Sequence, residues 1–393
     1  LVLPKEETDP LLTAFFTEIH PHFPILDPSS FVPRFDHVMF HGAGDDIDRA
    51  LCCVILALGK LALNRAVHSP GHYSGDPGLE YFGGAYHILT TQWVTSFDFG
   101  LPLPCGLVYL AIYLCYIERP LQGWKLIHMA STTLQGMLAQ LKPEFVTQED
   151  LDCLGRLCWT CFLIECDTLA EFHLPRSGME IVIDRMPFPC STDRIYQDGL
   201  PFLAICSIRR LLNRVHRVIY AAEDGPREKS WVGWALSQVP DPAISTMRSL
   251  ERVCAEFARQ LAAWLESLPT SIQPDLSQTI PNGLHDGWLR LRYWSARHII
   301  CRPCAIYAAT LPDHADVPGY VMKYSEVCVE SCRNYIETAV YVLGERTQYT
   351  RMTIQESLAC AFVLAIASDS HRLSHLVPDI STLLAKVTTA TQR

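Results

Sequence analysis

Hydrophobic residues recur along this chain mostly at three- and four-residue spacing, which is the period of an amphipathic α-helix. The clearest such series contains Leu250, Val253, Cys254, Phe257, Leu261, Trp264, Leu265 and Leu268. A second series contains Cys328, Cys332, Tyr335, Ile336, Ala339, Val340 and Leu343. Three more segments, Leu51 to Leu63, Leu107 to Ile117 and Leu358 to Ala367, are apolar nearly all round and are expected to be central helices. No series of alternating apolar and polar positions indicates strands, so the pattern predicts an all-α fold.

Proline and glycine mark the connections between these helices. The longest irregular stretch runs from Pro175 to Pro201 and contains four prolines. Loops of this size usually cover a site or carry function. We therefore expect any ligand pocket to lie among the three central segments, with this stretch as its lid and with Val182 and Ile183 forming a short extended piece in it. No polar linker divides the chain, and we expect residues 1–393 to form a single large multi-helix domain with Pro-rich connecting loops.

Near the N-terminus an apolar helix runs into a His-Pro-x-Phe-Pro sequence that includes Pro21 and Pro24. Each proline lacks an N–H and disfavours the helical conformation of the residue before it. The first helix is therefore expected to stop near Ile19. Ser29 or Ser30 is expected to cap the next helix.

Composition indicates a globular chain with an acidic balance. Hydrophobic residues make up 49% and charged residues 19%, with 32 Lys and Arg against 42 Asp and Glu, for a net charge of −10. This balance argues against a large phosphate-binding surface. The apolar run Leu107 to Ile117 is shorter than the roughly 20 residues of a membrane span, so no membrane partner is expected.

The 16 cysteines lie within apolar helical patterns and are expected to be reduced thiols of the cytosol or nucleus. Two pairs have Cys-x-x-Cys spacing, namely Cys158 with Cys161 and Cys301 with Cys304. Such pairs could hold one zinc ion if their helices met, although structural sites usually place them in turns. We interpret them as core residues.

Histidines offer two further candidate sites. His20 and His22 could chelate a metal, but Pro21 separates them and a packing and helix-stop role is favoured. His371 and His375 would share a helix face if the helix continued that far. No Glu lies between them in a His-Glu-x-x-His pattern, so a zinc hydrolase is not indicated. We predict no metal site and no catalytic residue in this chain.

Three carboxylates, Glu165, Asp167 and Glu171, cluster near one helix end. Paired carboxylates could serve acid–base catalysis or bind magnesium. The alternative is ion pairing in a buried network, and Arg302 is expected to be mostly buried and paired with Glu165 or Asp167. Trp159 is expected to be a core anchor.

Four stretches resemble the regulatory region of fungal zinc-cluster transcription factors, known as the fungal-specific transcription factor domain. They are Leu11 to Phe31, Gly123 to Ala130, Arg156 to Gly178 with its Arg-x-x-Trp helix, and Leu289 to Pro303 with its terminal Arg-Pro. The family-like region as a whole is expected to run from about residue 11 to about residue 367. The six closely spaced cysteines of the family's DNA-binding zinc cluster are absent from this chain.

The resemblance implies a regulatory domain of a nuclear transcription factor that responds to a small apolar effector or a partner protein. Expected partners are transcriptional co-regulators and a second copy of the chain, with DNA contacted only through a module outside it. No cofactor is expected here, since zinc belongs to the missing module. The expected ligand-binding residues are Trp124, Trp159, Glu165, Asp167, Glu171, Trp294 and Arg302. Two alternatives stay open, namely an enzyme for an apolar or isoprenoid substrate and a purely structural dimerisation module.

Overall fold

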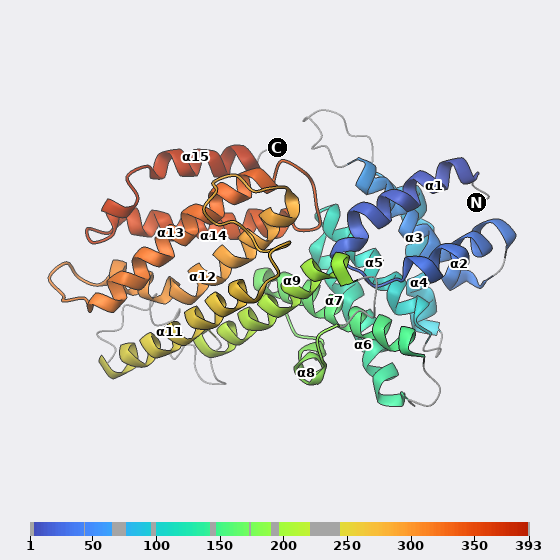
Figure 1. Cartoon of the computed structure of the whole chain (residues 1–393), viewed down its shortest axis with the longest axis horizontal. Coiled ribbons are helices and arrows are strands. Elements are labelled where there is room, and N and C mark those ends of the chain that lie inside the picture. Colours follow the sequence, from blue (N-terminus) through green and yellow to red (C-terminus); the bar gives the residue numbers. More distant parts are fainter. Residues whose placement is uncertain are drawn as a thin grey trace. The chain divides into compact units, whose positions relative to one another are not determined.

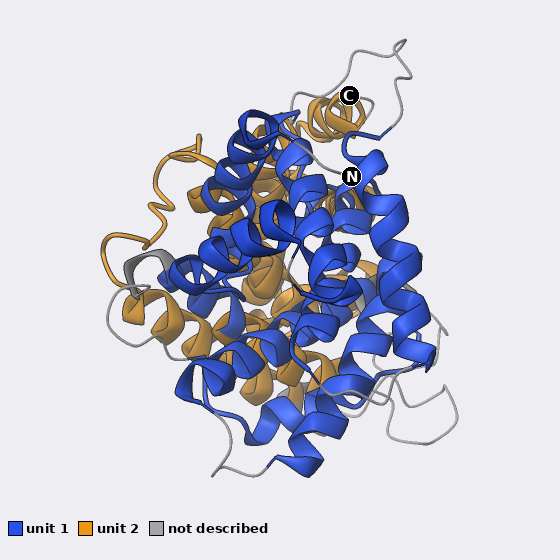
Figure 2. Cartoon of the chain, turned by 90° about the vertical axis from the view of Figure 1, so that its right-hand side faces the viewer, with its two compact units in different colours: residues 1–206, 345–352 blue, residues 207–344, 353–393 orange. Residues whose placement is uncertain are grey.

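The computed structural model describes residues 4–42, 44–64, 76–95, 100–141, 147–172, 174–189, 196–220 and 244–391. These residues form α-helices joined by short turns, and no β-strand occurs among them (Figure 1). The predicted all-α fold is therefore confirmed. The internal contacts divide the chain into two compact units, which Figure 2 distinguishes by colour. Unit 1 comprises residues 1–206 and 345–352, and unit 2 comprises residues 207–344 and 353–393. That the whole chain acts as one domain stays a prediction.

The helices of unit 1 follow one another along the chain. They are α1 (Lys5–Ala14), α2 (Pro28–His41), α3 (Asp46–Leu63), α4 (Leu79–Thr95), α5 (Pro102–Tyr116), α6 (Pro120–Gln140), α7 (Gln148–Phe172) and α8 (Met179–Arg185), and α9 (Tyr196–Val215) begins in this unit and ends in unit 2. Helix α5 is the central helix, because every side chain from residue 103 to residue 114 is buried. It packs against α3, α4, α6 and α7. The nearly all-round apolar pattern of this segment predicted that position.

Helix α1 lies against α3 at a close approach of the two backbones. A β-carbon added at Gly59 of α3 would overlap the carbonyl oxygen of Leu11 and lie 2.6 Å from its carbonyl carbon. Only glycine therefore fits at this crossing. The contact fixes where α1 ends and the segment after it begins.

The chain leaves α1 much as its prolines predict. A π-helical turn covers Phe15–Ile19 and a single 3-10 turn covers His20–His22. The cap of α2 is Asp27, whose carboxylate accepts a hydrogen bond of 2.8 Å from the backbone N–H of Ser29. The prediction that Ser29 or Ser30 caps this helix was wrong. Pro28 takes the first helical position, where its missing N–H costs nothing, so the residue before it becomes the cap.

The stretch from Pro175 to Pro201 is less irregular than its prolines suggest. It contains α8 and the start of α9, and residues 190–195 lie outside the described part of the chain. Val182 and Ile183 belong to α8, so the predicted extended piece was wrong. Ile183 and Met179 are buried one turn apart, which gives this short helix an apolar face.

Unit 2 is a separate group of packed helices. After the end of α9 come a π-helical turn η4 (His216–Tyr220), α11 (Ile244–Ser267), α12 (Leu284–Thr310), α13 (Gly319–Val342), α14 (Thr350–Asp369, from residue 353 in this unit), a 3-10 turn (Ser374–Leu376) and α15 (Ile380–Thr391). Helix α12 packs along α13, while α11 contacts α12 and α15 contacts α13. Because α14 ends at Asp369, His371 and His375 do not share a helix, and the condition for their pairing is not met.

Among the described helices, α14 is the one that is long and apolar enough to cross a bilayer. Core helices pass the same test of length and composition. In this helix 39% of the apolar window is buried within the protein. The buried positions include Thr353, Ser357, Cys360 and Leu364, which recur at three- and four-residue spacing. This pattern is that of a helix with one face in a protein core.

Candidate functional site

Unit 1 contains an open pocket of about 830 Å³. Its walls come from the segment before α2, the first turns of α2, the start of α5, the end of α6 and the start of α7, with Leu51 from α3. The apolar lining residues are Ile25, Leu26, Phe31, Leu51, Leu101, Pro102, Cys105, Met137, Leu141, Cys153 and Leu154, and the polar ones are Asp27, Ser30, Arg34, Gln140, Thr147, Glu149, Asp150 and Arg156. Most of this surface is apolar, and the volume lies within the range of about 300–1,000 Å³ that is usual for small-molecule sites.

The wall formed by residues 23–27 is held by hydrogen bonds to its backbone carbonyls. Arg156 of α7 is buried and donates from Nε and Nη2 to the Ile25 carbonyl, at 3.3 and 3.2 Å. Tyr109 of α5 donates to the Phe23 carbonyl at 3.4 Å, and a ring nitrogen of His20 lies 2.7 Å from the Leu26 carbonyl. An extended segment has no helical hydrogen bonds of its own, so these side chains satisfy its polar groups.

Two thiols in the pocket wall interact with each other and with Arg156. The hydrogen bond from Cys105 and the positive charge of Arg156 lower the pKa of the Cys153 thiol, against the opposing effect of burial. The same hydrogen bond, followed by burial, raises the pKa of Cys105. Cys153 is partly exposed, so its thiol combines access with a lowered pKa. That combination is typical of a reactive cysteine.

This environment predicts that Cys153 reacts with iodoacetamide faster than other partly exposed cysteines. The matched control is Cys53, which has similar exposure but a pKa raised mainly by burial. At neutral pH we expect Cys153 to be modified at least roughly ten-fold faster, since the reactive form is the thiolate. Peptide mass spectrometry over a time course measures both rates. Equal rates would show that Arg156 and Cys105 do not activate this thiol.

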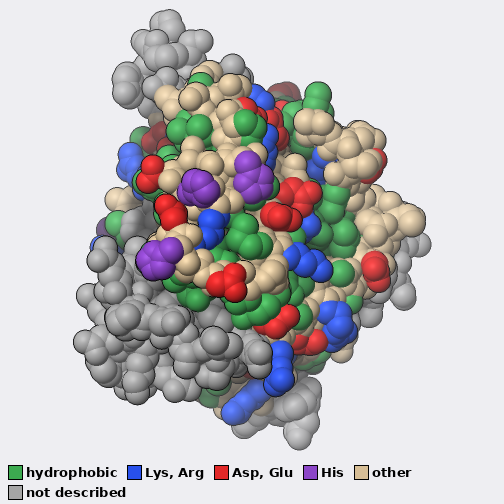
Figure 3. Space-filling model, turned by 90° about the vertical axis from the view of Figure 1, so that its left-hand side faces the viewer, with side chains coloured by type: hydrophobic (Ala, Val, Ile, Leu, Met, Phe, Trp, Pro, Cys, Tyr) green, Lys and Arg blue, Asp and Glu red, His purple; other side chains and the backbone are tan. Residues whose placement is uncertain are grey.

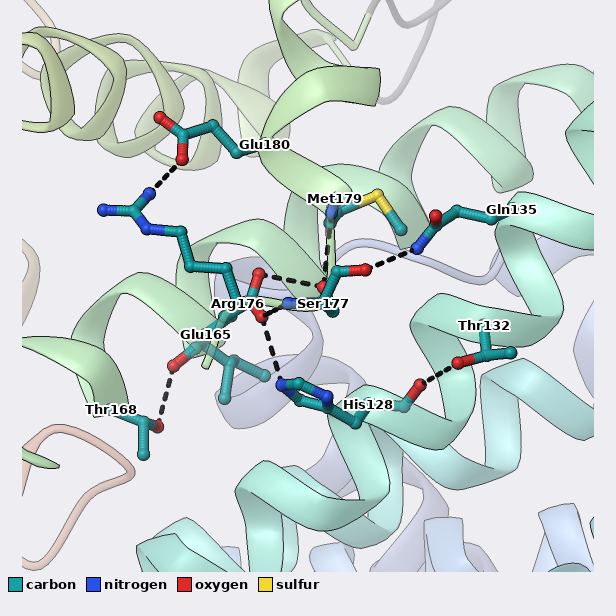
Figure 4. Close-up of polar contacts among 10 residues, drawn as sticks. His128, Thr132, Gln135, Glu165, Thr168, Arg176, Ser177, Met179 and Glu180 are labelled. Atoms are coloured by element: carbon teal, nitrogen blue, oxygen red, sulfur yellow. Dashed lines mark hydrogen bonds and ion pairs between the residues drawn. The ribbon is translucent and has the colours of Figure 1, made fainter. Parts of the chain in front are cut away.

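A second arrangement, in the same unit, surrounds Glu165 of α7 (Figure 4). Its carboxylate is 2% exposed and accepts hydrogen bonds from the backbone N–H of Ser177 at 2.5 Å and from the Ser177 hydroxyl at 3.0 Å. His128 Nε2 of α6 lies 3.3 Å from the same carboxylate, and Gln135 donates to the Ser177 carbonyl at 3.0 Å. The Ser177 hydroxyl in turn accepts the N–H of Met179, at the start of α8.

These contacts use Glu165 to hold the chain between α7 and α8. Both of its oxygens are engaged, and it does not line the 830 Å³ pocket. A carboxylate in this situation positions a loop and is poorly placed for acid–base catalysis. The buried-network alternative therefore describes Glu165 better, with Ser177 and His128 as its partners in place of an arginine.

Comparison with known proteins decides the family. The fungal specific transcription factor domain matches residues 12–264. This chain belongs to that family. The matched segment covers more than half of the chain and includes the pocket, the Glu165 contacts and the Arg-x-x-Trp helix. No curated protein and no solved structure matches the chain. Residues 289–303, which also resemble the family, lie beyond the matched segment.

The other expected ligand residues of unit 1 lie outside the large pocket. Trp124 of α6 is partly buried and packs on His128, with 4.3 Å between ring centroids. Trp159 is fully buried, and its Nε1 donates to the Pro187 carbonyl at 2.9 Å. Asp167 lines a much smaller pocket of about 40 Å³. Glu171 lies in α7, but its side chain is outside the described residues. A ligand-binding role for these residues stays a prediction.

In unit 2 the expected residues Trp294 and Arg302 lie on α12. Trp294 is 7% exposed, with the guanidinium of Arg297 5.5 Å from its ring centroid. Arg302 is partly buried, and its guanidinium lies 4.8 Å from the ring centroid of Tyr220. Burial lowers the pKa of Arg302, but Tyr220 and the Glu356 carboxylate raise it above its usual value. The structure thus gives Arg302 other partners than the predicted Glu165 or Asp167.

The remaining sequence candidates are packing residues. His20 and His22 are both buried, as expected for a helix-stop motif. Cys158 and Cys161 are also buried, and burial raises the pKa of Cys158 to about 12. The second pair, Cys301 and Cys304, is likewise buried. These thiols match the interpretation as core residues.

Sequence analysis missed most of the residues that line the pocket. It singled out the His-Pro-x-Phe-Pro segment and the Arg-x-x-Trp helix separately, but nothing local indicates that they meet. Arg156 and Ile25 are 131 positions apart in sequence. The sequence signal that could have indicated the pocket was the presence of these two family-like stretches, because each of them supplies one wall of the pocket.

Proposed function

We propose that this chain is the effector-responsive part of a fungal transcription factor and that the 830 Å³ pocket is its effector site. Membership of the fungal specific transcription factor domain family supports a role in regulating transcription, and such a role implies a nuclear protein. The observation that carries the effector site is the pocket, which is mostly apolar and lies within the family-matched segment. The effector is therefore a small and largely apolar molecule.

The pocket suggests how an effector changes the protein. Its walls come from α2, α5, α6 and α7 and from the extended segment 23–27, so a bound molecule would touch several elements at once. A ligand shifts a conformational equilibrium only as far as it binds one state better than another. In the observed state Arg156 is hydrogen-bonded to the Ile25 carbonyl. An effector that fits the pocket in this state would favour it over a state in which residues 23–27 have moved.

The contacts of Glu165 argue against the enzyme alternative. The carboxylate cluster that prompted this alternative does not converge on the large pocket, because Glu165 binds Ser177 and Asp167 lines a separate small pocket. We propose that the chain catalyses no reaction. Its DNA contacts would then come from a module outside this chain. On the face drawn in Figure 3, Lys and Arg are interspersed with Asp and Glu, so that face does not carry the basic patch typical of a DNA-binding surface.

The experiment fuses the chain to a heterologous DNA-binding module and measures reporter output in the presence of a panel of apolar compounds. Ser30 is exposed and lines the pocket, so Ser30→Trp places an indole ring in the space that a compound needs. The matched control is Ser29→Trp, because Ser29 is exposed but does not line the pocket. For an active compound, we expect Ser30→Trp to raise the half-maximal concentration by about ten-fold or more.

Ser29→Trp should leave that concentration unchanged within about two-fold, since its ring points outside the lining. Direct binding of the active compound to the purified chain, measured by calorimetry, should follow the same order. If Ser30→Trp and Ser29→Trp had the same half-maximal concentration for an active compound, the effector site would not be this pocket. Binding of the compound with no change in reporter output would remove the regulatory role.

A further inference from the structure

Three helices of unit 2 bring a group of metal-ligating side chains together. His298 of α12, Cys332 of α13 and Cys360 of α14 each offer one ligand atom, and these atoms all lie within 4.8 Å of one another. All three residues are fully buried, at 0% exposed. Among the described residues this is the group of three that could hold one ion.

A fourth ligand lies beside them. Cys328 precedes Cys332 by one turn of α13 and is also 0% exposed. The Cys332 thiol is hydrogen-bonded to both Cys328 and Cys360. Together with His298 this makes three sulfur atoms and one imidazole, supplied by three different helices. Zinc prefers four ligands of this kind in a tetrahedral arrangement.

The imidazole of His298 has one ring nitrogen held by a carboxylate and the other left for a ligand. Its Nε2 lies 2.5 Å from a carboxylate oxygen of Glu356, one turn before Cys360 on α14. Its Nδ1 is buried and has no hydrogen-bond partner among the described residues. Histidines that bind zinc usually give their other ring N–H to a carboxylate, which fixes the ring and raises its basicity. The Glu356 contact supplies that carboxylate.

We propose that His298, Cys328, Cys332 and Cys360 form a structural zinc site that joins α12, α13 and α14. Zn–S bonds of about 2.3 Å place tetrahedral sulfur ligands about 3.8 Å apart, so the ligand atoms of His298, Cys332 and Cys360, which lie within 4.8 Å of one another, have to approach by up to about 1 Å. The Cys328 thiol, which donates to the His298 carbonyl at 3.7 Å, has to turn away from that carbonyl to join them. Rotation of cysteine side chains provides a shift of this size. Binding forms three Zn–S bonds and one Zn–N bond and releases three thiol protons to solvent.

Two features of the surroundings are compatible with a bound ion. Three thiolates, a neutral imidazole and Zn²⁺ carry a net charge of −1, and the Glu356 carboxylate adds a second negative charge. The positive charge of Arg302, which acts on both Cys328 and Glu356, offsets part of this charge. An ion would also satisfy the buried Nδ1 of His298, which is costly to leave without a partner. Because all four ligands are buried, zinc would enter as the chain folds. This site is separate from the zinc cluster of the family's DNA-binding module.

The first test measures metal in the full chain, produced without an affinity tag in zinc-supplemented medium. Elemental analysis should find about one zinc per folded chain. Cys332→Ser should lower the zinc content at least five-fold, whereas the matched variant Cys158→Ser, at a buried thiol of unit 1, should retain it. Zinc below about 0.2 per chain in well-folded protein would overturn the proposal, as would copper found in place of zinc.

A second measurement keeps the proposal testable if Cys332→Ser does not fold. Cobalt substituted for zinc in the unaltered chain should show thiolate-to-cobalt charge transfer and the d–d bands of a tetrahedral ion. His298→Gln should shift the d–d bands and keep the charge transfer, since the three thiolates remain. A spectrum of octahedral cobalt, or one unchanged in folded His298→Gln, would place the ion elsewhere.

Discussion

Replacing Trp159 with Ala is expected to lower the free energy of unfolding by roughly 3–5 kcal/mol, the usual cost of deleting a buried aromatic ring. Trp159 is fully buried in α7. Its ring meets Phe162 edge-on, with centroids 5.8 Å apart, and stacks on Phe188 at 5.0 Å. Deletion would leave a cavity between α7 and the segment after α8. Urea denaturation followed by circular dichroism measures the loss.

Two variants separate the contributions to this effect. Trp159→Phe keeps an aromatic ring but leaves the Pro187 carbonyl without its 2.9 Å hydrogen bond. Loss of this hydrogen bond is expected to lower the free energy of unfolding by about 1–2 kcal/mol, in addition to any effect of the smaller ring on packing. Val94→Ala removes methyl groups from a side chain that is 72% exposed, and should change stability by less than about 0.5 kcal/mol. A loss below about 1 kcal/mol in Trp159→Ala would show that the ring does not anchor this core.

The helices were predictable because each depends on a local pattern. In α11 and α13 the apolar residues recur at helical spacing, and in α5 they surround the helix. Burial of such a face or surface is the main source of helix stability in proteins. The cap of α2 was also within reach of the sequence, since Pro28 favours the first helical position and leaves Asp27 as the cap.

The pocket was not predictable in the same way. The sequence analysis placed a site among the apolar segments 51–63, 107–117 and 358–367, with residues 175–201 as its lid. The observed pocket takes Leu51 from the first of these, and its lining includes no residue of the other two and no described residue of the lid. Helices α3 and α5 pack against each other and leave no space of this size between these segments in the described part of the chain, and the third segment belongs to unit 2. Space remains where helix ends and an extended segment meet, and that depends on contacts distant in sequence.

The cluster around His298 is another case in which local spacing misled. The Cys-x-x-Cys pairs were considered as metal ligands because of their spacing. Two cysteines three residues apart on a buried helix simply pack against neighbouring side chains, and this packing requires no metal ion. Cys328, Cys332 and Cys360 were assigned to the core, and they do lie in it. The sequence does not show that α12, α13 and α14 meet. Their meeting brings His298 next to Cys332 and Cys360.

Gly59→Ala is the second change expected to have a large effect, with a loss of about 3 kcal/mol or more in the free energy of unfolding. The added methyl group would overlap the Leu11 carbonyl oxygen, which is backbone and cannot rotate away. Helix α1 would have to move off α3. Denaturation of the variant measures the loss, and stability equal to the unaltered chain would show that the two backbones are not in contact.

Gly84→Ala is the matched control for this substitution. Gly84 lies in α4, and a β-carbon there meets nothing within 4 Å, so the change should stabilise the chain by roughly 0.5–1 kcal/mol through helix propensity alone. Helix α1 continues through the turns Phe15–Ile19 and His20–His22 into residues 23–27, the wall that Arg156 holds. Displacing α1 should therefore also weaken the effector response in the reporter experiment at temperatures where Gly59→Ala is still folded. Loss of stability with a fully preserved response would show that the pocket wall is positioned independently of α1.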